Sequence, residues 1–172
     1  MSGRSRDDAE LVREWATVVR GVEAVQHGFA LRLEGLDMTL PYFSVLTLLL
    51  DSDDERLPMS RIARDLAMTS GGFTKLADRM ARDGLIDRRG SSGDRRVVFA
   101  ALTDAGRVRA KAALDAYQAY LRDQVLPLVP VEEMRSLATI TSRLADSTGE
   151  HEIPPFELRP RSEGEPDRRA ED

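Results

Sequence analysis

The sequence predicts a mainly α-helical protein with one small β-hairpin near its middle. Apolar residues recur every three or four positions over most of the chain, which is the period of an α-helix. Two short apolar runs, 85–88 and 97–101, flank a glycine-containing segment, as in a hairpin. Charge is also segregated: residues 56–111 hold 13 Lys and Arg against 6 Asp and Glu, a net of +7 in a protein of net −5. A basic segment in an acidic chain is the electrostatic pattern expected of a nucleic-acid contact, although a solvated basic surface would look the same.

Length and composition exclude several classes of protein. The 172 residues suit one domain, or one small module with an assembly element. There is no cysteine, which excludes disulfides, thiolate metal sites and thiol redox sensing within this chain. No apolar run approaches the roughly 18 residues that span a bilayer, and the N-terminus lacks a signal-peptide core. We therefore expect a soluble, cytoplasmic protein with no membrane partner, no metal site and no cofactor.

The first long helix is expected from Asp8 to about Leu33, after a frayed polar start at 1–7. One stripe has heptad-like spacing and consists of Leu11, Trp15, Val18, Val22, Val25 and Phe29. Further apolar residues lie off this stripe, namely Ala16, Val19 and Ala30. Apolar residues on more than one face suggest burial between the chain's own domain and a partner subunit. The alternative is an ordinary amphipathic core helix.

A second helix is expected after Thr39, which caps it, with Pro41 in the first turn. Its apolar face is Tyr42, Phe43, Leu46, Leu49 and Leu50. The acidic segment 51–56 that follows lacks the alternating spacing and the glycine of a calcium loop, so we interpret it as a solvated turn.

Two short helices follow and form a helix–turn–helix pattern. The first is expected at 61–66, capped by Ser60, and the second at 70–83, capped by Thr69 and closed by Gly84. The hairpin comes next. Thr103 is expected to cap a long helix that reaches about 126, with Val108, Ala112, Tyr117, Tyr120, Leu121 and Val125 on its apolar face.

A last helix is expected at 131–145, with its apolar face made of Met134, Leu137, Ile140 and Leu144. The segment 147–172 is rich in Pro, Glu and Arg and poor in apolar groups, so we expect a disordered tail.

The second helix of the pair is the candidate reader of a DNA major groove. Gly71 and Gly72 each weaken a helix by roughly 1 kcal/mol relative to Ala, but missing side chains let backbone N–H groups approach phosphates. The alternative is that they serve a tight helix crossing. Lys75 and Thr74 are the candidates for base edges. The full set of candidate DNA contacts on the two helices is Ser60, Thr69, Ser70, Gly71, Gly72, Thr74, Lys75 and Arg79.

The hairpin tip offers a second contact through Asp94, Arg95 and Arg96. An arginine at an exposed tip can enter a narrow minor groove, where the negative potential is enhanced. Asp94 can orient the Arg95 guanidinium by a charge-assisted hydrogen bond. The alternative is an exposed ion pair that contributes little energy.

The run GLIDRRGSSGDRRVVFAALTDAGR resembles the winged-helix signature of the MarR family of bacterial transcriptional regulators: a D-x-R wing, a strand, and L-T-x-x-G opening a long helix. The preceding SRIARDLAMTSGGFTKLADRMARDGL is similar to that family's helix–turn–helix. The resemblance covers about residues 8–146. It implies a homodimer held by N- and C-terminal helices, a pseudo-palindromic operator, Asp94 and Arg95 at the wing positions, and a cleft for a small aromatic or phenolic effector.

These observations give a winged helix–turn–helix domain at 37–102, a helical dimerisation region from 8–36 and 103–146, and disordered tails at 1–7 and 147–172. The expected activity is sequence-specific DNA binding, most simply as a ligand-responsive repressor. A cleft could be lined by His27, Tyr42 and Phe43, although a lone histidine and two aromatic residues are more often packing residues. The competing class is a winged-helix protein–protein interaction module that does not read DNA. An enzyme has little support, because no nucleophile–base pair, metal cluster or phosphate loop is recognisable.

Overall fold

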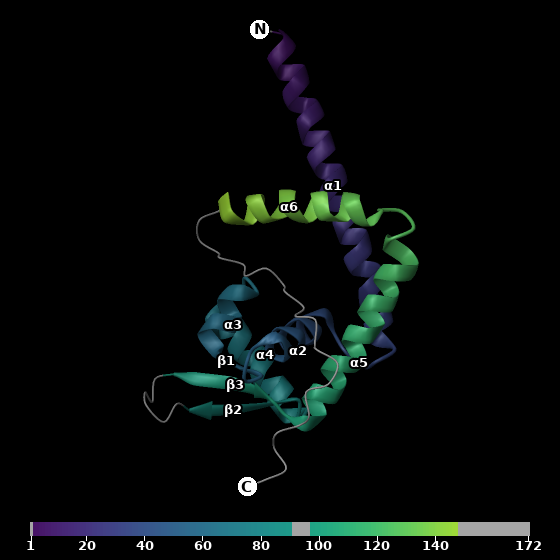
Figure 1. The fold of residues 1–172 in the computed structure, drawn as a ribbon. Coiled ribbons are helices and arrows are strands. Elements are labelled where there is room, and N and C mark those ends of the chain that lie inside the picture. Colours follow the sequence, from purple (N-terminus) through teal and green to yellow (C-terminus); the bar gives the residue numbers. More distant parts are fainter. Residues whose placement is uncertain (1, 91–96, 148–172) are drawn as a thin grey trace.

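The structure is a computed structural model that describes residues 2–90 and 97–147 (Figure 1). The elements, in chain order, are α1 (Ser2–Glu34), α2 (Leu40–Asp51), β1 (Arg56–Pro58), α3 (Met59–Asp65), α4 (Ser70–Arg82), β2 (Ile86–Gly90), β3 (Val98–Leu102), α5 (Asp104–Tyr120), a π-helical turn η1 (Leu121–Val125) and α6 (Val131–Ser147). The helices α2, α3 and α4 and the small sheet form one cluster, from which α1 and α5 extend as long helices (Figure 1). None of the described helices combines the length and apolar character needed to cross a bilayer.

The hairpin is part of a three-stranded antiparallel sheet in the order β1-β3-β2. The first strand, β1, consists of only three residues. In the structure Arg56 pairs with Ala101 and Pro58 with Phe99, so this short segment is a true edge strand. Proline is tolerated there because an edge strand has one row of backbone groups without a ladder partner. The sheet therefore joins the segment before α3 to the base of the hairpin.

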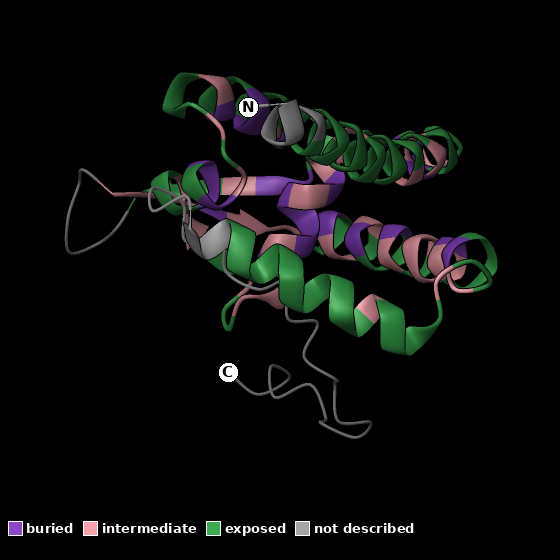
Figure 2. Ribbon diagram, turned by 90° about the horizontal axis from the view of Figure 1, so that it is seen from above, coloured by how far each residue is buried: buried purple, intermediate pink, exposed green. Residues whose placement is uncertain are grey.

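The buried residues form one core cluster that includes residues of all the helices from α1 to α5 and of the sheet, and the buried ribbon gathers in the middle of the molecule in Figure 2. At its centre, the Phe29 ring lies 4.9 Å from the Phe43 ring and 4.5 Å from the Tyr117 ring, measured between centroids. Phe29 and Phe43 meet edge to face, an arrangement that adds about 0.5–1.5 kcal/mol to the burial of the rings. One aromatic residue from each of three helices thus fixes their mutual positions.

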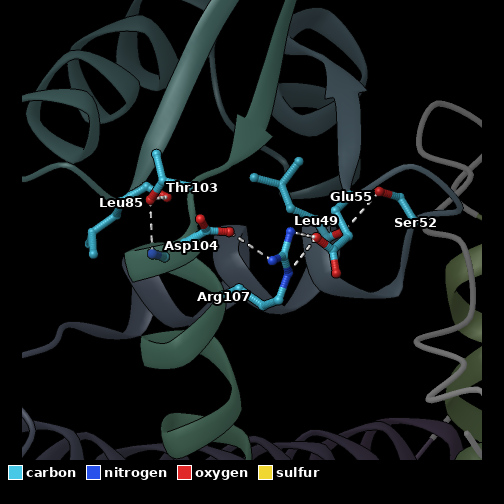
Figure 3. A network of polar contacts seen from close by, with 8 residues as sticks. Leu49, Ser52, Glu55, Leu85, Thr103, Asp104 and Arg107 are labelled. Atoms are coloured by element: carbon cyan, nitrogen blue, oxygen red, sulfur yellow. Dashed lines mark hydrogen bonds and ion pairs between the residues drawn. The ribbon is translucent and has the colours of Figure 1, made fainter. Parts of the chain in front are cut away.

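The start of α5 packs directly on the turn that follows α4 (Figure 3). The Thr103 hydroxyl oxygen accepts a hydrogen bond from the Gly106 N–H at 2.9 Å, which confirms the predicted cap, and the hydroxyl donates to the Gly84 carbonyl oxygen at 2.6 Å. A Cβ atom on Gly106 would lie 1.9 Å from the Leu85 carbonyl oxygen, which is impossible without backbone movement. The L-T-x-x-G motif therefore encodes a cap and a close approach of two backbone segments.

A charged network holds β1 against the same end of α5. In Figure 3 the Arg107 guanidinium lies between Glu55 and Asp104. Its Nε donates to Glu55 Oε2 at 2.7 Å and its Nη1 to Asp104 Oδ1 at 3.0 Å. Glu55 has φ +51°, an uncommon conformation for a residue with a side chain, and its carbonyl oxygen accepts from Leu102 N–H at 3.0 Å. The hydrogen bonds at Glu55 hold this strained residue in place.

The predicted caps at Thr39 and Thr69 are confirmed, and Gly84 has the left-handed φ of +71° expected after a helix. The predicted Ser60 cap is wrong. Helix α3 begins at Met59 behind Pro58, with no side-chain cap, because β1 runs into the helix without a linking residue. Helix α1 begins at Ser2 and not at Asp8, so the expected frayed start is wrong for 2–7. The expected tail beyond 147 lies outside the described residues.

The predicted apolar face of the long helix is partly wrong. Val108 is 68 % exposed and Ala112 is exposed, whereas Ala110 and Ala113 are buried. The contact of Gly106 with Leu85 sets the rotation of α5, and positions four, seven, eleven and fourteen residues later then face the core. The chain also continues past Tyr120 as a π-helical turn and not as a regular α-helix.

Much of the apolar surface of α1 and α6 is exposed in the described part of the chain. The exposed apolar residues of these helices are Leu11, Val12, Trp15, Val18, Val19, Val22, Leu31, Val131, Leu137, Ile140 and Leu144. Of the predicted inward face of α6, Met134 alone packs against the core. The remaining predicted core positions on α6 are wrong for a single chain, since no described element of that chain buries them.

We predict that Gly106→Ala lowers the free energy of unfolding by at least about 2–3 kcal/mol, because the new methyl group forces α5 away from Leu85. Urea unfolding followed by circular dichroism measures this. Gly21→Ala is the matched control, since a Cβ atom there meets nothing within 4 Å. A Gly106→Ala protein as stable as the Gly21→Ala protein would contradict the close approach.

The stability should fall in alkaline solution. Burial, and to a smaller extent the charge of Tyr120, raises the pKa of Tyr117 above its ordinary 10.0. A raised pKa in the folded state stabilises the protein below pH 10, and this contribution is lost as the pH rises through the folded value. Tyr117→Phe should therefore flatten the decline in unfolding free energy as the pH rises above about 10. If the unfolding free energies of the wild-type and Tyr117→Phe proteins fall in parallel as the pH rises, this expectation is wrong.

Candidate nucleic-acid interface

Helix α4 buries one face and exposes the other. Its buried residues are Phe73, Leu76, Ala77 and Met80, at the spacing of one helix face. On the exposed face, Gly71, Lys75 and Arg79 follow one another at intervals of one turn. Ser70 and Thr74 are exposed beside this row. The structure thus places five of the predicted contact residues on one solvent-facing side of a helix.

The glycines at the start of α4 do not serve a helix crossing. A Cβ atom on Gly71 would meet nothing within 4 Å, and one on Gly72 would meet only the Thr69 hydroxyl oxygen, at 2.9 Å. Thr69 uses that oxygen to accept a hydrogen bond from the Gly72 N–H at 3.1 Å. Gly72 therefore makes room for the cap, and Gly71 leaves the helix end open to an approaching molecule. The crossing interpretation is wrong.

Lys75 and Arg79 form no ion pair within the described part of the chain, whereas most of their basic neighbours do. Arginines nearby are held by carboxylates in the pairs Arg56–Asp54, Arg61–Asp65, Arg64–Asp65, Arg88–Asp78 and Arg89–Asp87. Arg82 donates its Nε to the Asp78 carbonyl oxygen at 3.3 Å. Two cations one turn apart thus remain available on the exposed face of α4 for an anionic partner.

The hydroxyl groups of Thr74 and Ser60, near the exposed face of α4, differ in their hydrogen bonding and position. Thr74 Oγ1 donates to the Ser70 carbonyl oxygen at 2.8 Å, so its proton is used within the helix and its lone pairs remain available. Ser60 is exposed in the first turn of α3. The Thr74 hydroxyl can therefore accept a further hydrogen bond but has no proton left to donate.

Asp94, Arg95 and Arg96 lie outside the described residues. The base of the hairpin is described, and β2 pairs with β3 as far as Gly90 opposite Val98. An ion pair between Arg88 on β2 and Asp78 on α4 joins this base to the exposed helix. The sequence did not single out this pair, because nothing in a spacing of ten residues shows that a strand will lie beside a helix.

A cavity of about 480 Å³ lies between α1, the start of α2, the α3–α4 turn and α5. It is lined by Val25, Gln26, Phe29, Leu40, Pro41, Phe43, Ser44, Leu66, Met68 and Tyr117, none of which is charged. Of the three residues proposed to line a cleft, Phe43 does so. His27 is exposed, and Tyr42 turns away and hydrogen-bonds to Asp83. Tyr117 and Met68 were missed, because their contribution depends on how α5 and the α3–α4 turn pack.

Comparisons with known proteins find a family model and several relatives that match part of the chain. The model of the MarR family matches residues 36–97. The transcriptional repressor YetL of Bacillus subtilis is 32 % identical over 93 residues, which cover 54 % of this chain and 53 % of the relative. The chain thus spans about half the length of this curated relative.

Solved structures of MarR-like proteins share the fold. Sco3205 of Streptomyces coelicolor, solved in complex with DNA, superposes with a TM-score of 0.75 at 23 % identity, over 81 % of this chain and 92 % of that one. The organohalide-sensing regulator RdhR, in its 2,4-dichlorophenol-bound form, gives a TM-score of 0.67 at 18 % identity, over 78 % of each chain. Residues 36–97 of the chain thus match the MarR family model, and the fold of the chain is MarR-like.

Proposed function

We propose that the protein is a sequence-specific repressor that binds a pseudo-palindromic operator as a homodimer and is released from it by a small aromatic ligand. The observation that carries the DNA-binding part is the exposed face of α4, where an open glycine end is followed by two cations without ion pairs in the described chain. Backbone N–H groups at a helix N-terminus attract phosphates, and lysine and arginine side chains recognise both phosphates and guanine edges. The relatives support the same assignment, since YetL is a transcriptional repressor and Sco3205 was solved in complex with DNA.

In this proposal, α4 enters the major groove and the hairpin tip reaches the adjacent minor groove. Lys75 and Thr74 read base edges, and the other candidates on α3 and α4, Ser60, Thr69, Ser70, Gly71, Gly72 and Arg79, position the helix on the backbone. Asp94, Arg95 and Arg96 supply the minor-groove contact. The Asp78–Arg88 ion pair supports the proposal that α4 and the hairpin contact adjacent grooves, because it fixes the base of the hairpin relative to α4.

The uncovered apolar surface supports the homodimer. Residues 8–36 and 103–146 would form the dimerisation region, and 37–102 the DNA-binding domain. The stripe on α1 that includes Trp15, which is 54 % exposed, is continuous over several turns. Apolar patches of this kind on a monomer mark interaction surfaces, and a second copy supplies the same stripe in return.

The cavity supports a ligand. Its wall is mostly apolar and aromatic, with Ser44, Gln26 and Tyr117 as polar groups, which is the usual character of a small-molecule site. The 2,4-dichlorophenol bound to RdhR belongs to the class of molecule that such a wall would hold. We propose a small aromatic or phenolic ligand for this cavity.

Lys75→Ala should weaken binding to a genomic DNA fragment that the protein itself selects by about 1–3 kcal/mol and lower the slope of log affinity against log salt by about 1 for each copy bound. A gel-shift titration at several salt concentrations measures both. Lys111→Ala is the matched control, because Lys111 is the chain's other lysine and lies on α5. Equal effects of the two substitutions would remove α4 from the interface. A wild-type protein that selects no fragment, or shows no salt dependence, would favour the protein–protein interaction module instead.

Trp15→Glu should dissociate the homodimer, because it places a charge in the apolar stripe that the partner would cover. Sedimentation should then give one chain mass, 19.1 kDa, where the wild-type protein gives twice that mass. Arg13→Glu is the control on the opposite side of α1. If the Trp15→Glu protein keeps the wild-type mass, or if the wild-type protein is already a monomer, the proposed interface is wrong.

A further inference from the structure

One residue of α2 connects the wall of the cavity to the end of α4. Pro41 and Phe43 both line the cavity, and Tyr42 stands between them in the first turn of α2. The Tyr42 side chain leaves the turn on another side, where its hydroxyl donates to Asp83 Oδ2 at 2.7 Å. A molecule in the cavity that displaces this turn would therefore also move the Tyr42 hydroxyl. That movement would act on Asp83, its hydrogen-bond acceptor at the C-terminal end of α4.

Asp83 occupies the position at which α4 becomes the hairpin. It is the C-terminal cap residue of α4, and its N–H donates to the Arg79 carbonyl oxygen at 2.9 Å. Gly84 follows with its left-handed φ, and Leu85 N–H closes the turn on the Met80 carbonyl oxygen at 2.9 Å. Gly106 of α5 packs on Leu85 of the same turn. The position of Asp83 therefore influences the relative positions of α4, β2 and α5.

The Tyr42–Asp83 bond has a neutral donor and a charged acceptor. Burial, then the hydrogen bond and the charge of Asp83, raise the pKa of Tyr42 above its ordinary 10.0, while Arg79 and Arg82 act in the opposite direction. The hydroxyl therefore keeps its proton throughout the physiological pH range. Hydrogen bonds to an ionised group are shorter and roughly twice as strong as neutral ones, so this contact can transmit a displacement.

We propose that Tyr42 is a positioning residue that couples occupancy of the cavity to the orientation of α4 on DNA, through its hydrogen bond to Asp83. This inference rests on the proposed function. The two-state element is the turn at 83–85, which either keeps α4 and the base of the hairpin in the DNA-binding arrangement or releases them. Neither Tyr42 nor Asp83 needs to touch DNA or the ligand for this role.

A double-mutant cycle tests the coupling without knowledge of the natural ligand. Ser44 is half-buried and lines the cavity, so Ser44→Phe places a tethered ring inside it. In the wild-type background we expect Ser44→Phe to weaken binding to the selected DNA fragment by about tenfold, within the usual range of allosteric coupling. In the Tyr42→Phe background the same substitution should weaken binding by less than about twofold, because the bond that transmits the displacement is missing.

Tyr120→Phe is the matched control background. Its hydroxyl also makes a hydrogen bond, to the Val25 carbonyl oxygen at 3.0 Å, but this bond joins α5 to α1 and not α2 to α4. There Ser44→Phe should keep its full effect of about tenfold. The proposal is overturned if Ser44→Phe lowers the DNA affinity by the same factor in the Tyr42→Phe and wild-type backgrounds. It is also overturned if Ser44→Phe has no effect in either background.

Hydrogen exchange gives a second readout that needs neither DNA nor a folded Ser44→Phe protein. Tyr42→Phe should raise the exchange rates of the Asp83, Gly84 and Leu85 amides by about fivefold or more, since their hydrogen bonds close the turn that the tyrosine holds. Tyr120→Phe should leave them unchanged. Unchanged rates in Tyr42→Phe would overturn the role of Tyr42. Failure of the wild-type protein to bind DNA would instead remove the proposed function, so the two failures are distinguishable.

Discussion

The space between the Gly106 Cα and the Leu85 carbonyl oxygen admits no side chain, and the arrangement of the domain depends on this contact. It fixes where α5 leaves the sheet and which of its faces meets the core. The rotation of α5 in turn brings Tyr117 against both Phe29 and Phe43, so one backbone approach determines both the aromatic centre of the core and one wall of the cavity. The Thr103 hydroxyl strengthens the same junction by bonding to both sides of it.

Pairing of charges decides which basic residues remain available to a partner. Asp78 binds Arg88 and Asp65 lies between Arg61 and Arg64, so these arginines serve the internal structure as well as the surface. Asp65 is the most deeply buried of these carboxylates, with a side chain 2 % exposed. Lys75 and Arg79 keep their charge available to solvent because no carboxylate of the described chain forms an ion pair with them. A net count of basic residues could not have made this distinction.

The sequence predicted those features that depend on neighbours close along the chain. Thr39, Thr69 and Thr103 cap helices, and Gly84 ends one, because each effect is local to a single turn. Features that depend on packing were missed or misplaced: the pairing of β1 with β3, the inward face of α5 and the direction of Tyr42. Tyr42 illustrates the reason. Its position in an apolar run suggested a core or cleft residue, and only the place of Asp83, 41 residues later, shows why its hydroxyl turns the other way.

The first half of α1 has a further consequence for the state of the isolated chain. From residue 7 to residue 24 every residue except Ala16 is exposed, so the core contributes almost nothing to this segment. Most of the stability of helices in proteins comes from the tertiary packing of an apolar face, and this segment has almost none within the described chain. The helix–coil equilibrium of these turns is therefore set by whatever covers their apolar stripe. Under the proposed assembly, dimer formation would stabilise the helical state of this segment. Its helicity would therefore rise with protein concentration, whereas the helicity of the core helices would stay constant.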